Sequence, residues 1–338
     1  MLSHPLFAAA TETARLHVSL WAWALLLGWF IGLILIDLLV LHREDHEPTL
    51  RSAIIQSLVW IGLAVALGGV IWAAYGSVAG GQYFSGYLIE KSLSVDNVFA
   101  WSVILTYFAV QKKYQFRVLY WGVFGALLMR AVFIFGGIAL IDRFEPILIV
   151  FGAILLYSGG KLLFTPDAKE FDPGSNVALK WFQRIVPVTH RDHGNKFFTH
   201  ENGRRVATML LVALVAVEIT DIIFAVDSVP AILAISRDPF IVFASNAAAI
   251  LGLRSLYFVF EAIKDRFWLL NRALGILLML VGVKMVLSPT TVFGRHWFGL
   301  EIPIIYSLLG IGVLVGGAIA LSLLIPAPRK NADRTEDY

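Results

Sequence analysis

Long apolar stretches, each about the length of a membrane-spanning helix, recur along the whole chain. A helix needs roughly 20 apolar residues to cross the ~30 Å hydrocarbon core of a bilayer. We count nine such stretches, at 20–41, 53–75, 84–109, 117–140, 145–164, 206–234, 239–261, 267–287 and 302–325. The connections between the fourth and fifth stretches and between the sixth and seventh are short, so their neighbours are expected to form antiparallel hairpins. The pattern predicts an all-α polytopic membrane protein with about nine transmembrane helices.

The composition agrees with a bilayer environment. Hydrophobic residues make up 58% of the chain and charged residues 15%, with a mean hydropathy of +0.77, whereas about 25% of the residues in an ordinary soluble domain are charged. The chain has no cysteine, which excludes disulfides, thiolate metal sites and thiol redox chemistry. The stretch 20–41 is too long and too rich in tryptophan for a cleaved signal peptide, so we expect a retained helix.

The distribution of lysine and arginine between the stretches predicts their orientation. One alternating set of connections holds 18 of the 27 lysines and arginines, and the other set holds four. The richer set is 42–52, 110–117, 165–205, 262–272 and 326–338. Because positively charged loops stay in the cytoplasm, we expect a bacterial inner-membrane protein with its N-terminus outside and its C-terminus inside. The net charge of +3 then reflects topology and gives no reason to expect nucleic-acid binding.

Ionisable side chains also fall inside the predicted helices, where an unpaired charge costs at least ~2.5–3.5 kcal/mol. The bases are Lys91, Arg130, Lys161, Arg254 and Lys284. The acids are Asp37, Glu90, Asp96, Glu218, Asp221 and Asp227. So many charges at membrane depth indicate a transport pathway or a binding site.

An internal repeat relates these charges. The stretch 90–100 aligns with 221–231 at an offset of 131, and both acids of the first stretch coincide with acids of the second. The arginines 130 and 254 and the lysines 161 and 284 align further on, at offsets of 124 and 123. Each half thus has acids on its first helix, an arginine on its second and a lysine on its third. Because three helices is an odd number, the second half is expected to be inverted relative to the first, as in many secondary transporters.

The repeat divides the chain into seven predicted segments. They are an outside N-terminal segment (1–19), two leading helices (20–83), the first three-helix repeat (84–164), a cytoplasmic loop (165–205), the inverted second repeat (206–287), a final helix (288–325) and a cytoplasmic tail (326–338). A duplicated bundle with a purely structural role is the alternative, since buried ion pairs can also fix helix register.

Carboxylates at membrane depth suit a hard divalent cation such as Mg²⁺, Ca²⁺ or Mn²⁺. All eight histidines lie outside the predicted helices, which makes zinc, copper and nickel poor candidates. Residues six apart on a helix are roughly 120° and ~9 Å apart, so one helix cannot chelate an ion with both of its acids. We therefore expect Asp96 and Asp227 to face each other across the repeat axis, with Glu90, Glu218 and Asp221 either around that site or at a transient site of their own.

Two further residues belong to the predicted site. Asn97 supplies a neutral oxygen and is grouped with the acids as a candidate ligand. Pro230 lacks a backbone donor, so we expect it to unwind its helix locally and to free carbonyl oxygens as additional ligands. For Asp37, near the inner end of the first helix, a structural or interfacial role is favoured over metal binding.

The four repeated bases are expected to interact with the acids. Arg130 and Arg254 would pair with carboxylates when metal is absent, or would simply tie helices together. Lys161 and Lys284 would do the same or take part in proton exchange. Such exchange is chemically reasonable because desolvation raises the pKa of a carboxylic acid and a bound cation lowers it.

The predicted cytoplasmic loop holds a second group of polar side chains. It consists of His190, Asp192, His193, His200 and Glu201. These residues could bind a regulatory metal, but a solvated polar loop is the favoured interpretation.

The two acidic segments closely resemble those of the TerC family. They are GYLIEKSLSVDNVF at 86–99 and EITDIIFAVDSVPA at 218–231, and the similarity continues over 238–254. The resemblance extends from about residue 20 to 325 and is strongest to the Alx branch. It implies a nine-span protein related to the LysE-type exporters, associated with Mn²⁺ export and the response to alkaline pH. The acids of the family fall on Glu90, Asp96, Glu218, Asp221 and Asp227.

Two classes of function remain open at this point. The first is an exporter of divalent cations, above all Mn²⁺, that exchanges them for protons and holds no permanent cofactor. The second is a membrane interaction protein that assists the assembly or metal loading of exported proteins, in contact with the secretion machinery. An enzyme is not expected, because no His-Glu-x-x-His motif and no Ser/His pairing occurs at membrane depth.

Overall fold

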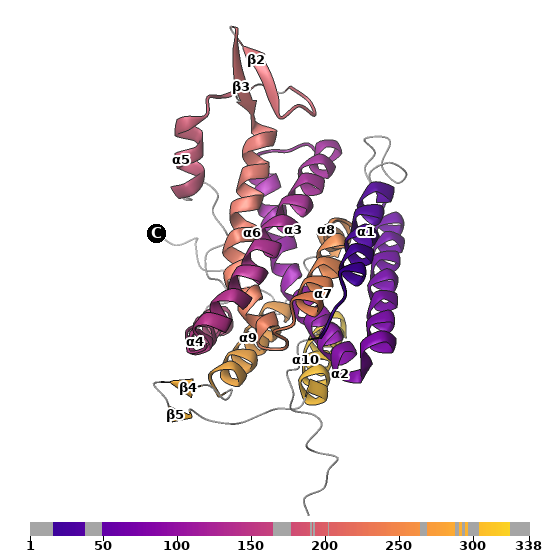
Figure 1. Cartoon of the computed structure of the whole chain (residues 1–338). Coiled ribbons are helices and arrows are strands. Elements are labelled where there is room, and N and C mark those ends of the chain that lie inside the picture. Colours follow the sequence, from indigo (N-terminus) through magenta and orange to yellow (C-terminus); the bar gives the residue numbers. More distant parts are fainter. Residues whose placement is uncertain are drawn as a thin grey trace, which may run out of the picture.

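Helices dominate the part of the chain that the structure describes (Figure 1). The computed structural model describes residues 16–37, 49–164, 177–189, 191, 193–201, 203–263, 269–287, 291–292, 295–296 and 304–324. The helices are α1 (Leu20–Ile36), α2 (Leu50–Tyr107), α3 (Lys112–Arg143), α4 (Ile147–Phe164), α5 (Val177–Ile185), α6 (Met209–Leu233), α7 (Pro239–Leu251), α8 (Leu253–Ile263), α9 (Leu270–Leu287) and α10 (Ile304–Leu324). The predicted outside segment up to residue 15 and the tail from 326 lie outside the described residues.

Several helices are long and apolar enough to cross a membrane. Within the described ranges these are α2, α3, α4 and α6, and the bent pair α7 and α8 adds a fifth. The helices α1 and α10 are apolar but shorter in the parts that qualify. The prediction of an all-α membrane protein is therefore confirmed, and the total of nine crossings stays a prediction.

The connection expected at 76–83 is reduced to one residue. Gly76, with φ 87° and ψ 177°, is the only non-helical position inside α2, and a positive φ is a conformation that glycine adopts without strain. The chain folds back at Gly76, as a hydrogen bond across it shows: the Tyr83 hydroxyl donates to the Ala64 carbonyl at 2.8 Å. A Cβ atom on Gly80 would lie 2.7 Å from Trp72 Cβ, so the two halves of α2 pack closely.

The helices α4 and α9 pack against each other through glycines. A Cβ atom on Gly159 would lie 2.7 Å from the Gly275 carbonyl oxygen, and one on Gly152 would lie 3.0 Å from the Gly282 carbonyl oxygen. The contacts run in opposite chain directions, so the pair is antiparallel. Small residues of this kind let helix backbones approach closely in a bilayer.

The break expected at Pro230 is not observed. The helix α6 continues through Pro230 to Leu233. This proline stands in the last turn, where little helix remains to be disrupted. The break lies instead at Gly252, where α7 and α8 meet at an angle of 44°.

The predicted cytoplasmic loop contains structure that its polar sequence did not reveal. It forms the helix α5 and three strands, β1 (Val188–Thr189), β2 (Phe198–Glu201) and β3 (Arg204–Thr208). The order is β1-β3-β2, with β3 parallel to β1 and antiparallel to β2. The hairpin of β2 and β3 extends beyond the end of α6 (Figure 1). Two further short strands, β4 (Thr291–Val292) and β5 (Arg295–His296), form a separate pair.

Candidate metal and proton site

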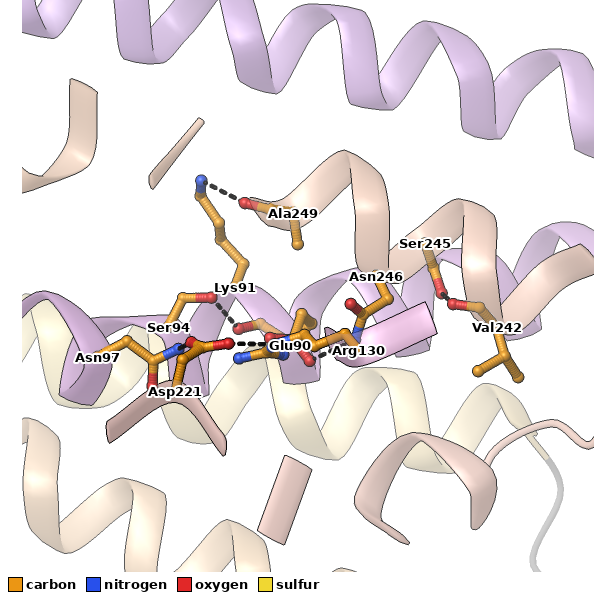
Figure 2. Close-up of polar contacts among 10 residues, drawn as sticks. All are labelled: Glu90, Lys91, Ser94, Asn97, Arg130, Asp221, Val242, Ser245, Asn246 and Ala249. Atoms are coloured by element: carbon orange, nitrogen blue, oxygen red, sulfur yellow. Dashed lines mark hydrogen bonds and ion pairs between the residues drawn. The ribbon is translucent and has the colours of Figure 1, made fainter. Parts of the chain in front are cut away.

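A buried cluster of three charges joins α2, α3 and α6. Arg130 Nη1 donates to Glu90 Oε1, and Arg130 Nε lies 3.6 Å from Asp221 Oδ2. The three side chains are at most 1% exposed. Figure 2 shows the guanidinium between the two carboxylates. The sequence prediction that Arg130 pairs with carboxylates agrees with this geometry, and the two acids come from the two halves of the predicted repeat.

Side-chain amides complete the hydrogen bonding of this cluster. Asn97 Nδ2 donates to Asp221 Oδ1 at 3.2 Å, and Asn246 Nδ2 donates to Glu90 Oε2 at 2.8 Å. Glu90 and Asn97 lie on one face of α2, because seven residues make about two helical turns. We call this set, Glu90, Asn97, Arg130, Asp221 and Asn246, the arginine cluster.

Several buried polar atoms of the arginine cluster lack a hydrogen-bond partner among the described residues. They are Arg130 Nε, Arg130 Nη2, Asp221 Oδ2 and Asn246 Oδ1. A buried polar group without a partner costs about 1–3 kcal/mol, and such groups gather where water or an ion is accommodated. Among the described residues, the arginine cluster therefore keeps both donors and acceptors that make no hydrogen bond.

The remaining pair of repeated acids forms a second group, which we call the lysine cluster. Asp96 lies within electrostatic range of Asp227, and the expectation that the two face each other across the repeat stays a prediction. Asp227 Oδ1 accepts a hydrogen bond from Ser158 Oγ at 2.7 Å. The charge of Lys161, one turn further on in α4, acts on the same carboxylate. Lys161 is exposed at the surface of the bundle, and the other three residues are partly buried.

Glu218 stands beside the arginine cluster. Its carboxylate interacts with that of Asp221, one turn further along α6. The carboxylate occupies the space where a side chain on Gly125 of α3 would begin. Glycine at 125 is thus what allows Glu218 to reach α3.

The five predicted acids do not meet in one place. No group of three or more histidine, aspartate or glutamate side chains in the described ranges is arranged to hold a metal ion. The six-residue spacing along α2 and α6 separates the acids into the two clusters, and the guanidinium stands between Glu90 and Asp221. The assignment of Glu90, Asp96, Asn97, Glu218, Asp221 and Asp227 as metal ligands stays a prediction.

The second arginine of the repeat pairs outside the repeat. Arg254 Nη2 donates to Asp37 Oδ1 at 2.6 Å, so it links α8 to the end of α1. Its guanidinium also lies over the Phe116 ring, 4.4 Å from the centroid. This pairing favours the structural role expected for Asp37. Lys284 lies partly buried in the last turn of α9.

Part of the polar loop group comes together beside the small sheet. His193 Nε2 lies 3.0 Å from Glu201 Oε1, which also accepts from Thr189 Oγ1 at 2.8 Å. These hydrogen bonds lower the pKa of the Glu201 carboxyl below its usual range. His200 pairs with Arg205 in the ladder instead. The predicted partners His190 and Asp192 lie outside the described residues.

Sequence reasoning did not assign a role to Ser158 or Lys91. Ser158 could have been found from its spacing, since it stands one turn before Lys161 on the same helix. Lys91 Nζ donates to the Ala249 carbonyl of α7 at 3.3 Å. No local pattern announces that contact, because the two residues are 158 positions apart.

The chain is similar to known membrane proteins over most of its length. A family model described as "Integral membrane protein TerC family" matches residues 75–330. An "Uncharacterized membrane protein STKORF319" of Myxococcus xanthus is 41% identical over 92% of this chain and 95% of its own. The "Putative membrane-bound redox modulator Alx" of Escherichia coli K12 is 41% identical over 75% of this chain and 81% of its own. The protein of that name from Salmonella typhi is 37% identical over 83% and 88%. No solved structure matches.

Proposed function

Because the chain belongs to the TerC family of integral membrane proteins, we propose that it exports divalent cations, above all Mn²⁺, from the cytoplasm in exchange for protons. The buried carboxylates of the arginine and lysine clusters would bind the cation. The protein would lie in a bacterial inner membrane in the orientation that its lysines and arginines predict.

The observation that carries the proposal is the sharing of Arg130 by Glu90 and Asp221. Two carboxylates and one guanidinium, counted as ionised, leave a formal charge of −1 in a buried place. The acids of the lysine cluster likewise outnumber its one base. An excess negative charge away from water strongly favours the uptake of a proton or a cation.

Arg130 gives this site an internal cation. In the arrangement seen here the guanidinium offsets one of the two negative charges, where a divalent cation would offset both. A divalent cation that displaced it would take Glu90 and Asp221 as hard oxygen ligands, with Asn97 and Asn246 nearby. A cation shifts a conformational equilibrium only by binding one state better than another, so the exchange of Arg130 for metal provides the required difference.

The glycine contacts of α4 and α9 support an inverted repeat. At the offset of 123, Gly152 corresponds to Gly275 and Gly159 to Gly282. The contacts observed are 152 with 282 and 159 with 275. Exchanging equivalent positions turns one contact into the other, which is what a two-fold relation between two inverted halves predicts. Such a relation places a transport site between the halves.

The donor set supports manganese among the transition metals. The two clusters offer carboxylate, amide and hydroxyl oxygens, and the described membrane helices bring no imidazole to them. Oxygen ligands suit Mg²⁺, Ca²⁺ and Mn²⁺. The choice of Mn²⁺ among these three follows the resemblance to the TerC family.

The proposal is tested by metal transport in proteoliposomes. Purified protein is reconstituted, and Mn²⁺ uptake is followed with an entrapped indicator, with and without a pH gradient. Asp96→Asn and Asp227→Asn should each reduce the initial rate at least tenfold. Glu145→Gln is the matched control, because Glu145 is partly exposed and pairs with Arg237 at 3.6 Å. Rates that stay unchanged in both aspartate variants, or no uptake by the parent protein, would contradict transport.

The second function, an interaction protein, is favoured by the division of the acids into two clusters. A static bundle could use these ion pairs to fix helix register. Co-purification with secretion machinery that survives neutralisation of all five acids would support it over transport. The redox role in the names of the relatives would need chemistry other than thiol exchange in this chain, because it has no cysteine.

A further inference from the structure

The helix α7 is the most enclosed helix of the bundle. It has 13 residues, and every one from Phe240 to Leu251 is buried. A helix this rich in apolar residues is suited to the interior of a protein or to a membrane span. It ends inside the protein, at the bend of 44° where α8 begins. The carbonyl groups of its last turn therefore need partners that neither water nor lipid supplies.

Charged side chains stand at both ends of α7. At the N-terminal end, Asp238 Oδ1 accepts hydrogen bonds from Phe240 N at 3.0 Å and Ile241 N at 3.1 Å. At the C-terminal end, Lys91 Nζ donates to the Ala249 carbonyl at 3.3 Å. A carboxylate at the start and an ammonium at the end both complement the dipole of a helix.

The break itself is shaped around Lys91. A Cβ atom on Gly252 would lie 3.1 Å from Lys91 Nζ and 3.0 Å from Trp60 Cβ. Any larger residue at 252 would crowd the ammonium. The position where the span bends is thus also the position that leaves room for the lysine head.

Two consecutive residues of α2, Glu90 and Lys91, form hydrogen bonds with α7, and we call these two contacts the grip (Figure 2). The Glu90 carboxylate accepts from Asn246 Nδ2 at 2.8 Å, and the Lys91 ammonium donates to the Ala249 carbonyl at 3.3 Å. The first contact belongs to the arginine cluster, and the second lies at the break. A movement of α7 relative to α2 must therefore alter both.

The contact between Lys91 and α7 has no counterpart in the other half of the repeat, on either side of the contact. The residue that corresponds to Lys91 in the second half is Ile222, which has no charge. The helix that corresponds to α7 and α8 in the first half is α3, which runs unbroken from Lys112 to Arg143. Neither Lys91 nor the break at Gly252 has an equivalent in the other half, and the two lie together. This points to a specific role for the contact between Lys91 and the end of α7.

We propose that Lys91 is a positioning residue, a fixed built-in cation at the C-terminal end of α7 that holds the α7–α8 span in its bent form. The half-helix end is a kind of place where broken helices of transporters bind coupling cations. Here the Lys91 ammonium occupies that place. Release of this contact would let the span straighten and would move Asn246 away from Glu90, so the grip would control access to the carboxylates. The last step rests on the proposed transport function, but the bend does not.

The bend can be measured without transport. The chain has no cysteine, so spin labels at Arg237→Cys and Ala262→Cys, at the two ends of the span, give one distance by double electron–electron resonance. Lys91→Met should add a second, longer distance to the distribution. Lys91→Arg keeps the charge and should restore the single distance of the parent. Lys180→Met removes an exposed lysine of α5, outside α2, α7 and both clusters, and should leave the distance unchanged.

Lys91→Gln separates charge from hydrogen bonding and guards against loss of folding in the methionine variant. It keeps an N–H donor and should still show the longer distance. A parent-like distribution in both Lys91→Met and Lys91→Gln would overturn the proposal, and a parent-like distribution in Lys91→Gln alone would overturn the role of the charge.

Transport gives the second measurement. In proteoliposomes Lys91→Met should lower the maximal Mn²⁺ rate about tenfold while the concentration for half-maximal rate changes less than about twofold, because the carboxylates are untouched. Lys91→Arg should recover most of the rate. If the parent protein moves no Mn²⁺, the proposed function fails while the distance measurement still decides the role of Lys91. A rate unchanged in Lys91→Met, beside an altered bend, would contradict control of access.

Discussion

Replacing Arg130 by methionine is the sharpest test of the arginine cluster. The change removes the guanidinium that Glu90 and Asp221 share and leaves a buried pair of like charges. Removing one partner of a buried ion pair costs about 3–5 kcal/mol. At 1.4 kcal/mol per factor of ten, the ratio of folded to unfolded protein should fall by roughly 10²- to 10⁴-fold.

The effect should be reversed by neutralising the acids. A triple variant that adds Glu90→Gln and Asp221→Asn to Arg130→Met has no charged side chain left in the arginine cluster, so it should recover most of the lost stability. Unfolding in mixed micelles by sodium dodecyl sulfate, followed by tryptophan fluorescence, compares the three proteins. A divalent cation at 100 times the Kd of the single variant should stabilise that variant by about 2.7 kcal/mol, and it should stabilise the parent less, because the guanidinium competes for the carboxylates.

Two results would refute this reasoning. If the single variant unfolded at the same detergent fraction as the parent, the guanidinium would not be neutralising the carboxylates. If the triple variant were no more stable than the single one, the loss would come from packing of the long arginine side chain and not from its charge.

Three other predictions concern single contacts. Gly159→Ala should destabilise the protein by about 1–3 kcal/mol through overpacking, whereas Gly160→Ala, with no atom within 4 Å of its new Cβ, should be tolerated; thermal unfolding compares them. Gly125→Ala should displace the Glu218 carboxylate and raise the Mn²⁺ concentration for half-maximal transport in proteoliposomes. An unchanged concentration would argue against a role of Glu218 in the pathway. The pKa of Glu201 is lowered in the folded protein, so its contribution to stability is present above the usual carboxyl pKa and lost as the pH falls through the lowered value; Thr189→Val should raise that pKa in an NMR titration.

The sequence was most informative where charge and repetition coincide. An ionisable residue in an apolar helix needs a partner, so the pairing of Arg130 with carboxylates could be expected from hydropathy, whereas its sharing between the two halves is seen only in the structure. The same logic predicts that Asp96 faces Asp227. Glu218 was expected near the site, but its approach to Gly125 depends on how closely α3 and α6 pack.

The contacts that escaped prediction are tertiary. Arg254 pairs with Asp37, which belongs to a helix outside the repeat, so the symmetry of the sequence gave no hint of it. The break at Gly252 also escaped notice, because proline at 230 is the stronger local signal and yet lies near a helix end that tolerates it. The small sheet arises from short strands whose pairing is not evident from their polar composition.

The strand β3 ends at Thr208 and α6 begins at Met209, with no connecting residue between them. The three-stranded sheet is therefore joined directly to the helix that bears Glu218, Asp221 and Asp227. Tilting or turning of α6 during a working cycle would swing the β2–β3 hairpin through the surrounding water. A dye attached to the tip of that hairpin would therefore report movement of α6, and with it of the buried acids, from outside the membrane-spanning helices.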